Sequence, residues 1–382
     1  MAPRSKKRSR RRGSPEARLT DDLLVEILCR LPAKSLCACK CVSKRWRGLI
    51  SDPDHRKKLP QMLTGFFYMS LNTDRCPKVA RHFTNVLRGE GPSISPSLPF
   101  LRLRYRVCLH ILDCCNGLLL GRIPNYTVPA TFEYLVCNPA TENWLVLPGS
   151  TWSADLPIAR LGFEPAVSSH FHVFEFEEHE DGYVKGVQIY SSKTRAWSQK
   201  DSGWSFGLTI CRGSRSVFFN GMLHLVTYEN VVAAVDVEAK TWRIIPMPYD
   251  DEYYPFTIDE AFIDLAQGNL YLATNISDNL TIWVLEDYGS EESEDWTLKH
   301  RVRYRRKFQL DVINSDNGCG LVSIYPEGNA IFCVDGDDKM LMSYQMDSKQ
   351  STLPVAHVLG HDCQGPYLPY VPNFLESLAD GQ

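Results

Sequence analysis

Apolar residues follow two different periods along the chain. Between residues 19 and 59 they recur every three or four positions, the spacing that lines one side of an α-helix. The apolar positions of this first segment are Leu19, Leu23, Leu24, Ile27, Leu28 and Leu31. Beyond residue 60 the helical period gives way to short runs rich in Val, Leu, Phe, Tyr and Trp, which are typical of β-strands. The pattern predicts a small helical unit followed by a larger unit built from strands.

Polar residues and prolines mark where the helices begin and end. Thr20 can accept hydrogen bonds from free amides of the first turn, and Asp21 and Asp22 place negative charge at the positive end of the helix dipole. Pro32 cannot continue this helix and favours a new start. A second apolar stripe ends at Asp52. Its positions are Val42, Trp46, Leu49 and Ile50. We expect a helix, a short helix and another helix.

This segment resembles an F-box in the order and spacing of its apolar residues, although Thr20 replaces the proline that is usual after the first leucine. A unit of about 40 residues cannot bury all its apolar side chains against itself, so some must face another body. In the F-box family that body is the Skp-type adaptor of cullin-based SCF ubiquitin ligases. The resemblance assigns adaptor contacts to Leu19, Leu23, Leu24, Ile27, Leu28, Leu31, Pro32, Leu36, Val42 and Trp46. The alternative is a helical hairpin folded onto the rest of the protein, because periodicity alone cannot name a partner.

A tryptophan repeats at regular intervals in the strand-rich segment. Trp144, Trp197 and Trp242 each lie six residues after a turn-forming residue, and Trp296 follows a longer acidic loop. Their separations are 53, 45 and 54 residues. Another 54 residues lead to Gln350, in a segment with the same residue pattern but with no tryptophan. Such spacing is typical of β-propeller blades, and we expect these rings to pack between blades rather than contact a ligand.

Tight turns run in phase with the tryptophans. They lie at Asn116–Gly117, Asn220–Gly221, Gly268–Asn269 and Gly328–Asn329. A PAVSS turn near Ser168 fills the widest gap. Each repeat is then a set of four antiparallel strands, with the tight turn after the first strand and the tryptophan on the last. Residues 62–112 are expected to supply one further blade, which gives about six blades, with five or seven left open.

The strand-rich segment resembles the F-box-associated, kelch-like propeller region of many plant F-box proteins, through its repeat spacing and phrases such as NPATENWLVLP. The predicted fold class is therefore α+β and multidomain, with a small all-α F-box of three helices followed by an all-β propeller. The expected domains are a disordered basic tail at residues 1–18, the F-box at 19–59, the propeller at 60–372 and a C-terminal tail at 373–382.

Charge is unevenly distributed. The formal net charge is −3, yet residues 4–12 read RSKKRSRRR and hold seven basic side chains. This tail predicts a nuclear-import signal, and the alternative is a solubilising tail that associates with nucleic acid. The near-neutral body argues against nucleic acid as the main partner. No apolar run reaches the roughly 18 residues of a membrane span, so we expect a protein of the nucleus and cytoplasm, with its 13 cysteines reduced.

Motifs of enzymes and metal sites are missing from the sequence. It contains no GxxxxGKS/T, no GxGxxG after a strand, no GxSxG and no HExxH. The densest metal-like group is His170, His172, Glu175 and His179, but on a strand Glu175 points away from the two histidines before it. A hydrogen-bonded strand with a solvated acidic turn is the preferred interpretation. We predict a non-catalytic protein with no cofactor and no metal.

A row of cations is the candidate target-binding surface. If WTLKHRVRYRRKF forms a strand, one of its faces carries Lys299, Arg301, Arg303 and Arg305. This row is expected to be a solvated outer strand balanced by the acidic loop at residues 286–295, and the alternative is a site for an acidic or phosphorylated partner.

Together the resemblances imply a substrate receptor of an SCF-type ubiquitin ligase. The F-box would bind the Skp-type adaptor and, through it, cullin, while the propeller would hold an unknown target protein for ubiquitination and proteasomal degradation. Two other classes remain open. A propeller enzyme predicts His, Asp or Tyr side chains that converge at the axis, and a nuclear scaffold outside ubiquitination predicts salt-sensitive binding of nucleic acid. Loops vary freely over a constant propeller frame, so the sequence does not identify the target.

Overall fold

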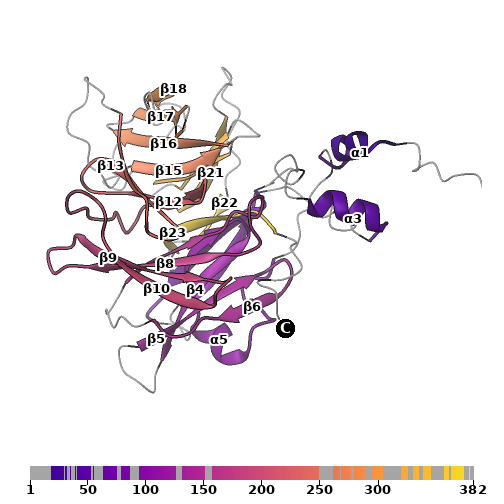
Figure 1. The fold of residues 1–382 in the computed structure, drawn as a ribbon, viewed down its shortest axis with the longest axis horizontal. Helices are drawn as coiled ribbons and strands as arrows, with labels where there is room; N and C mark the ends of the chain where they lie inside the picture. The colour runs from indigo at the N-terminus through magenta and orange to yellow at the C-terminus, as the bar shows by residue number, and fades with distance from the viewer. Residues whose placement is uncertain are drawn as a thin grey trace, which may run out of the picture. The chain divides into compact units, whose positions relative to one another are not determined.

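The structure, a computed structural model, divides into two units, Met1–Met62 and Leu63–Gln382 (Figure 1). The first unit is helical and the second is built from strands, as the change of apolar period predicts. The described residues are 19–29, 31, 35, 39, 41–52, 55, 63–74, 79–86, 94–125, 131–150, 157–248, 261–266, 268–276, 279–286, 288–289, 295–303, 320–325, 330–334, 339–345, 357–360, 363–373 and 378.

Two capped helices dominate the described part of the helical unit. The first, α1 (Asp21–Leu28), begins after Thr20, whose hydroxyl accepts a hydrogen bond from an amide of the first turn at 3.4 Å. The second, α3 (Lys44–Ser51), begins after Ser43, which caps it in the same way at 3.2 Å. This confirms Thr20 as the cap of the first helix. The short helix expected between them falls mostly on residues outside the described part of the chain.

Helices α1 and α3 share a small apolar core. It consists of Leu24, Val25, Leu28, Leu49 and Ile50. A polar clamp holds the start of α1 to α3, because Arg45 donates from Nε to Asp21 Oδ1 at 2.8 Å and from Nη2 to the carbonyl of Leu19 at 2.6 Å. Both side chains of the ion pair are exposed, so the clamp fixes the orientation of the helices more than it stabilises them.

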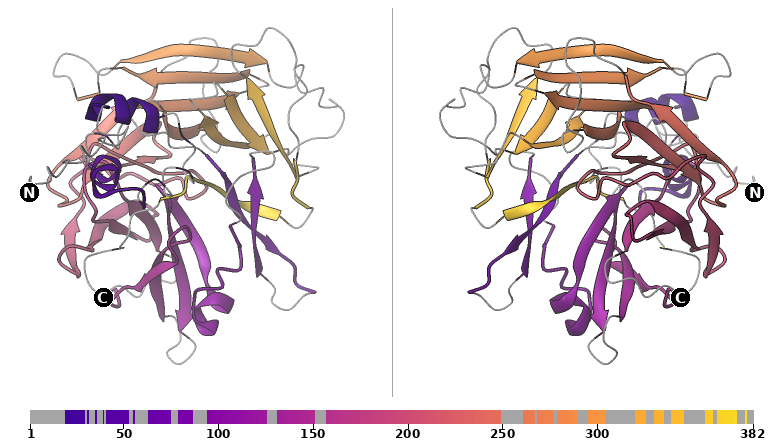
Figure 2. Two further views of the ribbon diagram at one scale, coloured as in Figure 1. Left: turned by 90° about the vertical axis from the view of Figure 1, so that its right-hand side faces the viewer. Right: turned by 90° about the vertical axis from the view of Figure 1, so that its left-hand side faces the viewer.

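Six antiparallel sheets in the described part of the second unit form the blades of a β-propeller (Figures 1 and 2). The first blade consists of β1 (Gly65–Leu71), β2 (Val79–Asn85) and β23 (Cys363–Tyr370). The second consists of β3 (His110–Cys115), β4 (Leu118–Asn125), β5 (Thr131–Asn138) and β6 (Asn143–Val146). The third consists of β7 (Ile158–Gly162), β8 (His172–Glu178), β9 (Val184–Ser191) and β10 (Ala196–Asp201).

The other three blades have four strands each in sequence order. They are β11 (Val217–Phe219), β12 (Met222–Val226), β13 (Val231–Asp236) and β14 (Trp242–Pro246); β15 (Ala261–Ala266), β16 (Asn269–Ile276), β17 (Asn279–Leu285) and β18 (Trp296–Arg303); and β19 (Gly320–Tyr325), β20 (Ala330–Val334), β21 (Met340–Gln345) and β22 (His357–Val358). Six blades confirm the central prediction of the fold.

The last strand of the chain closes the ring. Strand β23 pairs antiparallel with β1, with Gly65 opposite Tyr370, so the first blade joins the two ends of the propeller. The innermost strands then contact one another in a complete circle, in the order β23, β3, β7, β11, β15 and β19. A closed ring leaves no inner strand without neighbours.

The composition of the first blade corrects the expectation for residues 62–112. Among the described residues of that segment, β1 and β2 belong to the first blade, and β23 supplies its third strand. Residues Leu103–Cys108 form a short helix, α5, and β3 already belongs to the next blade. The alternation of arginines with Leu103 and Val107 imitates a strand, but both side chains are exposed and Tyr105 instead packs edge-on against the ring of Trp144 at 5.4 Å.

The tryptophans lie where the repeat predicts them. Each is the first or second residue of the outermost strand of its blade and packs against an apolar cluster shared by two neighbouring blades. Two of the indoles also donate a hydrogen bond to the blade before them, Trp197 to the carbonyl of Pro148 and Trp296 to that of Pro246, both at 2.8 Å. This confirms that they pack between blades. Gln350 and the Gly328–Asn329 turn lie outside the described residues.

One tight turn also holds the end of the chain. Asn116 and Gly117 have φ values of +46° and +84°, as the Asn–Gly turn between β3 and β4 requires. The amide of Asn373 donates to the carbonyl of Asn116 at 3.1 Å, and Asn138 donates to the carbonyl of Asn373 at 2.8 Å. Leu378 packs against the cluster between the second and third blades. Residues that were expected to form a C-terminal tail therefore contact the propeller.

Alanine at Gly117 tests this attachment. A Cβ there would lie 2.6 Å from the backbone of Val371 and Asn373, whereas one at Gly221, with a similar φ of +72°, would meet nothing within 4 Å. We expect Gly221→Ala to cost about 1 kcal/mol of unfolding free energy through backbone strain, and Gly117→Ala about 2 to 4 kcal/mol, because overlap is added to the same strain. Urea unfolding measures both. Equal losses would mean that the C-terminal segment does not rest on this turn.

A buried histidine predicts a pH dependence of stability. His224 Nδ1 donates to the carbonyl of Val217 at 3.2 Å, so the neutral ring accepts at Nε2 from the hydroxyl of Tyr288, 2.7 Å away. Burial lowers the pKa of His224 to about 4. The unfolded imidazole takes up a proton below about pH 6.5, so stability is fully present above that pH and falls between about 6.5 and 4, by on the order of 3 kcal/mol.

The change is measured by urea unfolding across that pH range. His224→Gln should lower stability at pH 7 yet flatten the slope between pH 6.5 and 4. A variant with an unchanged slope would show that His224 does not titrate as described.

Candidate functional site

The apolar residues predicted to contact an adaptor divide into two groups in the structure. Leu24 and Leu28, at 0% and 1% exposure, belong to the core of the helical unit. Leu23 and Ile27, at 52% and 44%, form an exposed i, i+4 row on α1 beside that core, and Val42 is also exposed just before α3. An exposed apolar row next to a filled core is typical of a surface that binds a partner.

The remaining members of the predicted set are less informative. Leu19, Leu31 and Trp46 are partly buried and pack against the same small core. Pro32 and Leu36 lie outside the described residues. The sequence treats all ten residues as one surface because a 3.6-residue period does not separate a side chain facing the second helix from one facing outward.

The predicted row of cations lies on β18, the outermost strand of the fifth blade. Lys299 forms an ion pair with Glu286 at 2.5 Å, which is the balance between this strand and the acidic loop that the sequence predicts. A register shift occurs at Lys299, so the simple alternation expected along the row is interrupted there. Arg301 is exposed, and Arg305 lies outside the described residues. Target binding by this row stays a prediction.

The histidine-rich segment has a structural explanation. Glu175 is buried and accepts a hydrogen bond from the hydroxyl of Tyr134 on the second blade at 3.2 Å. His179 pairs with Asp181 at 3.3 Å in the acidic turn. Among the residues that the structure describes, no three His, Cys, Asp or Glu side chains are grouped so that they could hold a metal ion.

Two buried carboxylates tie the inner strands together at the axis. Asp113 of β3 accepts from the amide of Leu161 on β7 at 2.7 Å and from the hydroxyl of Ser216, just before β11, at 3.4 Å. Burial raises the pKa of Asp113, although the nearby Arg160 guanidinium and the amides of Leu161 and Cys114 oppose the shift. Because the backbone of a neighbouring blade uses this carboxylate, we assign it a structural role.

Asp264 of β15 occupies the same kind of position. It accepts from the amide of Ile324 on β19 at 2.9 Å and from the hydroxyl of Ser323 at 3.0 Å. Arg215, from the loop before β11, donates to its other oxygen at 2.5 Å. The two aspartates and Arg215 therefore connect five blades through polar contacts. A lone Asp in an apolar inner strand, in HILDCC and AFIDLA, is the sequence signal that could have identified them.

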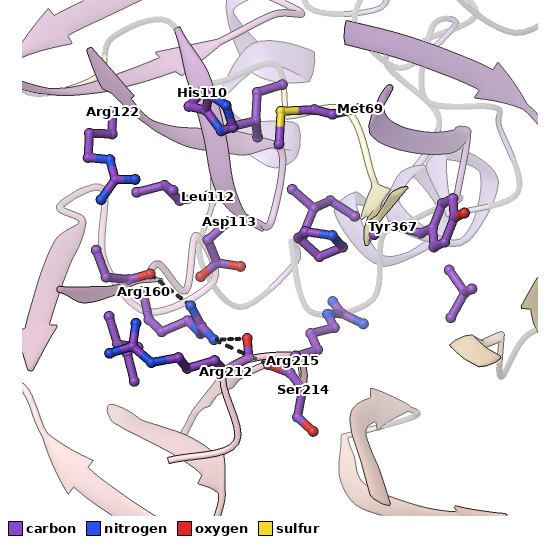
Figure 3. Close-up of a pocket in the computed structure, with 18 of the residues that line it drawn as sticks. Met69, His110, Leu112, Asp113, Arg122, Arg160, Arg212, Ser214, Arg215 and Tyr367 are labelled. Carbon is purple, nitrogen blue, oxygen red and sulfur yellow. Dashed lines mark hydrogen bonds between the residues drawn. The ribbon is translucent and has the colours of Figure 1, made fainter. Parts of the chain in front are cut away.

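A cavity of about 440 Å³ lies beside this network. Figure 3 shows that its two sides differ, with Arg122, Arg160 and Arg212 on the left and Met69 and Tyr367 on the right. The polar side comes from β3, β4, β7 and the loop before β11. The apolar side comes from β1, β15, β19 and β23, including Phe262. The sequence alone does not reveal this site, because its residues come from distant segments that meet only when the ring closes.

Arginine is the dominant polar residue of the cavity wall. Arg160 donates to three carbonyls, those of Ala159, Arg212 and Ser214, at 3.1 to 3.3 Å. Arg212 pairs with Glu178 outside the cavity. Burial lowers the pKa of Arg160 and of Arg122, and burial together with the charges of Arg122 and Arg81 lowers the pKa of His110 in the same wall. The side of the cavity built by the second to fourth blades is electropositive.

Comparison with known proteins agrees with both units. A family model described as F-box domain matches residues 17–58, and one described as F-box associated beta propeller domain matches residues 69–379. The second match covers most of the chain, so the chain belongs to the family of F-box proteins that carry an F-box-associated propeller.

Plant F-box proteins are similar to this chain over most of its length. F-box protein At5g07610 of Arabidopsis thaliana is 29% identical over 330 residues, which cover 79% of this chain and 75% of the relative. F-box protein At5g49610 of the same plant is 27% identical over 316 residues, which cover 75% of this chain and 79% of the relative. The resemblance to plant F-box proteins is confirmed. No helix in the described residues is long and apolar enough to cross a membrane.

Proposed function

We propose that this protein is the substrate-receptor subunit of an SCF-type ubiquitin ligase and performs no bond chemistry itself. The F-box binds a Skp-type adaptor and, through it, cullin, while the propeller holds a target protein for ubiquitination and proteasomal degradation. The observation that carries the proposal is the exposed row of Leu23 and Ile27 beside a core that is already filled. Family membership supports it, because this chain matches both the F-box model and the model of the F-box associated propeller.

The rival functions have less support. A propeller enzyme predicts His, Asp and Tyr side chains that converge at the axis, and the cavity does contain His110, Asp113 and Tyr367. Backbone amides of β7 and of Cys114 already use both oxygens of Asp113, which favours a structural role over catalysis. A nuclear scaffold that acts through the basic tail rests on residues 4–12, which lie outside the described part of the chain.

Acidic substitutions on α1 test the adaptor contact. Ile27→Asp removes an exposed apolar side chain and places a charge in the proposed interface, so capture of the Skp-type adaptor should weaken by about 10- to 100-fold with little change in unfolding temperature. Val358→Asp, which changes an even more exposed apolar side chain on the propeller, is the matched control. Leu24→Asp should instead unfold the helical unit, because Leu24 is fully buried.

The ubiquitination role is measured in the same experiment. With the proteasome blocked, ubiquitin conjugates captured with the intact protein should be missing from the Ile27→Asp sample. Unaltered adaptor capture by Ile27→Asp would remove α1 from the interface. Normal capture without any difference in conjugates would favour a scaffold.

The basic tail carries the proposed distribution between nucleus and cytoplasm. Deletion of residues 1–13 removes all seven basic side chains of RSKKRSRRR and should shift the protein toward the cytoplasm, as imaging of a fluorescent fusion would show. A distribution identical to that of the intact chain would contradict an import role.

A further inference from the structure

Two arginines of the axial cavity form no direct ion pair within the described part of the chain, although Asp113 lies near Arg160 and Glu175 lies near Arg122. Arg122 has its guanidinium carbon 5.4 Å from the ring centre of Phe132, and no described residue accepts a hydrogen bond from it. Arg160 is held by three carbonyls, which are neutral. By contrast, Arg212 and Arg215 each form an ion pair. Two positive charges therefore face the cavity without a hydrogen-bonded counter-charge.

Such an arrangement favours the binding of an anion. A guanidinium that is partly removed from water loses hydration, and a neutral carbonyl returns only part of that loss. Among the described residues that line the cavity, Asp113 is the one carboxylate, and although it lies near Arg160, its two oxygens accept hydrogen bonds from the amides of Leu161 and Cys114. An anion inside the cavity would receive charge-assisted hydrogen bonds, which are about twice as strong as neutral ones.

The direction of the donors favours a phosphoryl group over a carboxylate. Arg122 comes from β4, Arg160 from β7, and Arg215 from the loop before β11, so their groups reach the cavity from separate blades (Figure 3). Nε of Arg215 is buried and has no hydrogen-bond partner. A carboxylate offers two oxygens in one plane, whereas a phosphoryl group offers three oxygens that point in different directions.

The opposite wall indicates what the phosphoryl group is attached to. Met69, Phe262 and Tyr367 present apolar surface to the same cavity, whose volume of about 440 Å³ exceeds what a bare phosphate needs. An inorganic anion would leave this surface in contact with water. An organic phosphate would cover it, which adds about 25 cal/mol for each Å² of apolar area removed from water.

We propose that the axial cavity binds a phosphate monoester, with the phosphoryl group against Arg122 and Arg160 and the organic part against Met69, Phe262 and Tyr367. Two sources share this chemistry, a phosphorylated side chain of the target protein and a small phosphate ester. The first source rests on the proposed function, because it makes the cavity the place where the propeller recognises its target.

Calorimetric titration of the full chain tests the proposal with four probes. They are inorganic phosphate, phenyl phosphate, a short peptide with one phosphoserine between two leucines, and the same peptide without phosphate. Phenyl phosphate should bind more tightly than inorganic phosphate, and added salt should weaken both. Binding of the phosphopeptide but not of its unmodified form identifies a side chain as the source, whereas binding of phenyl phosphate alone identifies a small ester.

Matched variants locate the site. Arg122→Gln should weaken phosphate-ester binding by about tenfold or more, and Met69→Glu should abolish it by placing a carboxylate on the opposite wall. Arg243→Gln is the control, because Arg243 also lies over an aromatic ring, that of Tyr288 at 4.9 Å, but not in the cavity. Unfolding temperatures of all three variants exclude a general loss of structure.

Two results would overturn the proposal. One is the absence of saturable binding by any phosphate probe at millimolar concentration, and the other is equal binding by the intact chain and Arg122→Gln. Either result leaves adaptor capture untouched, because that contact is measured through Ile27 on the other unit. Loss of adaptor capture by the intact chain would in turn leave phosphate binding intact.

Discussion

The pairing of β23 with β1 is the constraint on which the rest of the propeller depends. Through it the first blade is assembled from both ends of the unit, and the inner strands become a circle. In the ring, β3 and β7 lie side by side, as do β15 and β19, and Asp113 and Asp264 accept hydrogen bonds from the next blade. These contacts join consecutive blades, whereas the cavity beside them is also lined by β1 and β23 and therefore depends on closure of the ring.

The two units use their side chains in different ways. In the propeller, each apolar cluster lies between two neighbouring blades, so most large side chains are fully covered by the fold itself. In the described part of the helical unit, five residues form the core, while Leu23 and Ile27 are exposed. The small size of the unit explains the difference, since a small domain keeps a large fraction of its surface exposed. A partner that packs against α1 would bury the apolar side chains that the helical unit leaves exposed.

Sequence reasoning predicted the parts of the fold that repeat. The intervals between Trp144, Trp197, Trp242 and Trp296 reflect one blade each, and the Asn–Gly turns have the positive φ values that their residue types favour. These features depend on local chemistry, so each can be recognised within a short segment. The exposed and buried rows of α1 were predicted as one stripe and needed the second helix to separate them.

Features that depend on distant contacts were not predicted. The strand-like alternation in α5 was misleading because the place of a third strand in the first blade is taken by β23, some 250 residues later in the chain. Arg122, Arg160 and Arg215 belong to different blades and share no motif. The bulge at Lys299 is set by pairing with β17, which residue types alone do not determine.

The position of β23 also fixes an order of events during synthesis. A ribosome synthesises the helical unit first and β23 almost last. The five four-stranded blades therefore cannot form a closed ring until residues 363–370 have been synthesised. Synthesis of the helical unit is complete long before the propeller can close. The exposed row of Leu23 and Ile27 is therefore present on the nascent chain before the axial cavity is complete.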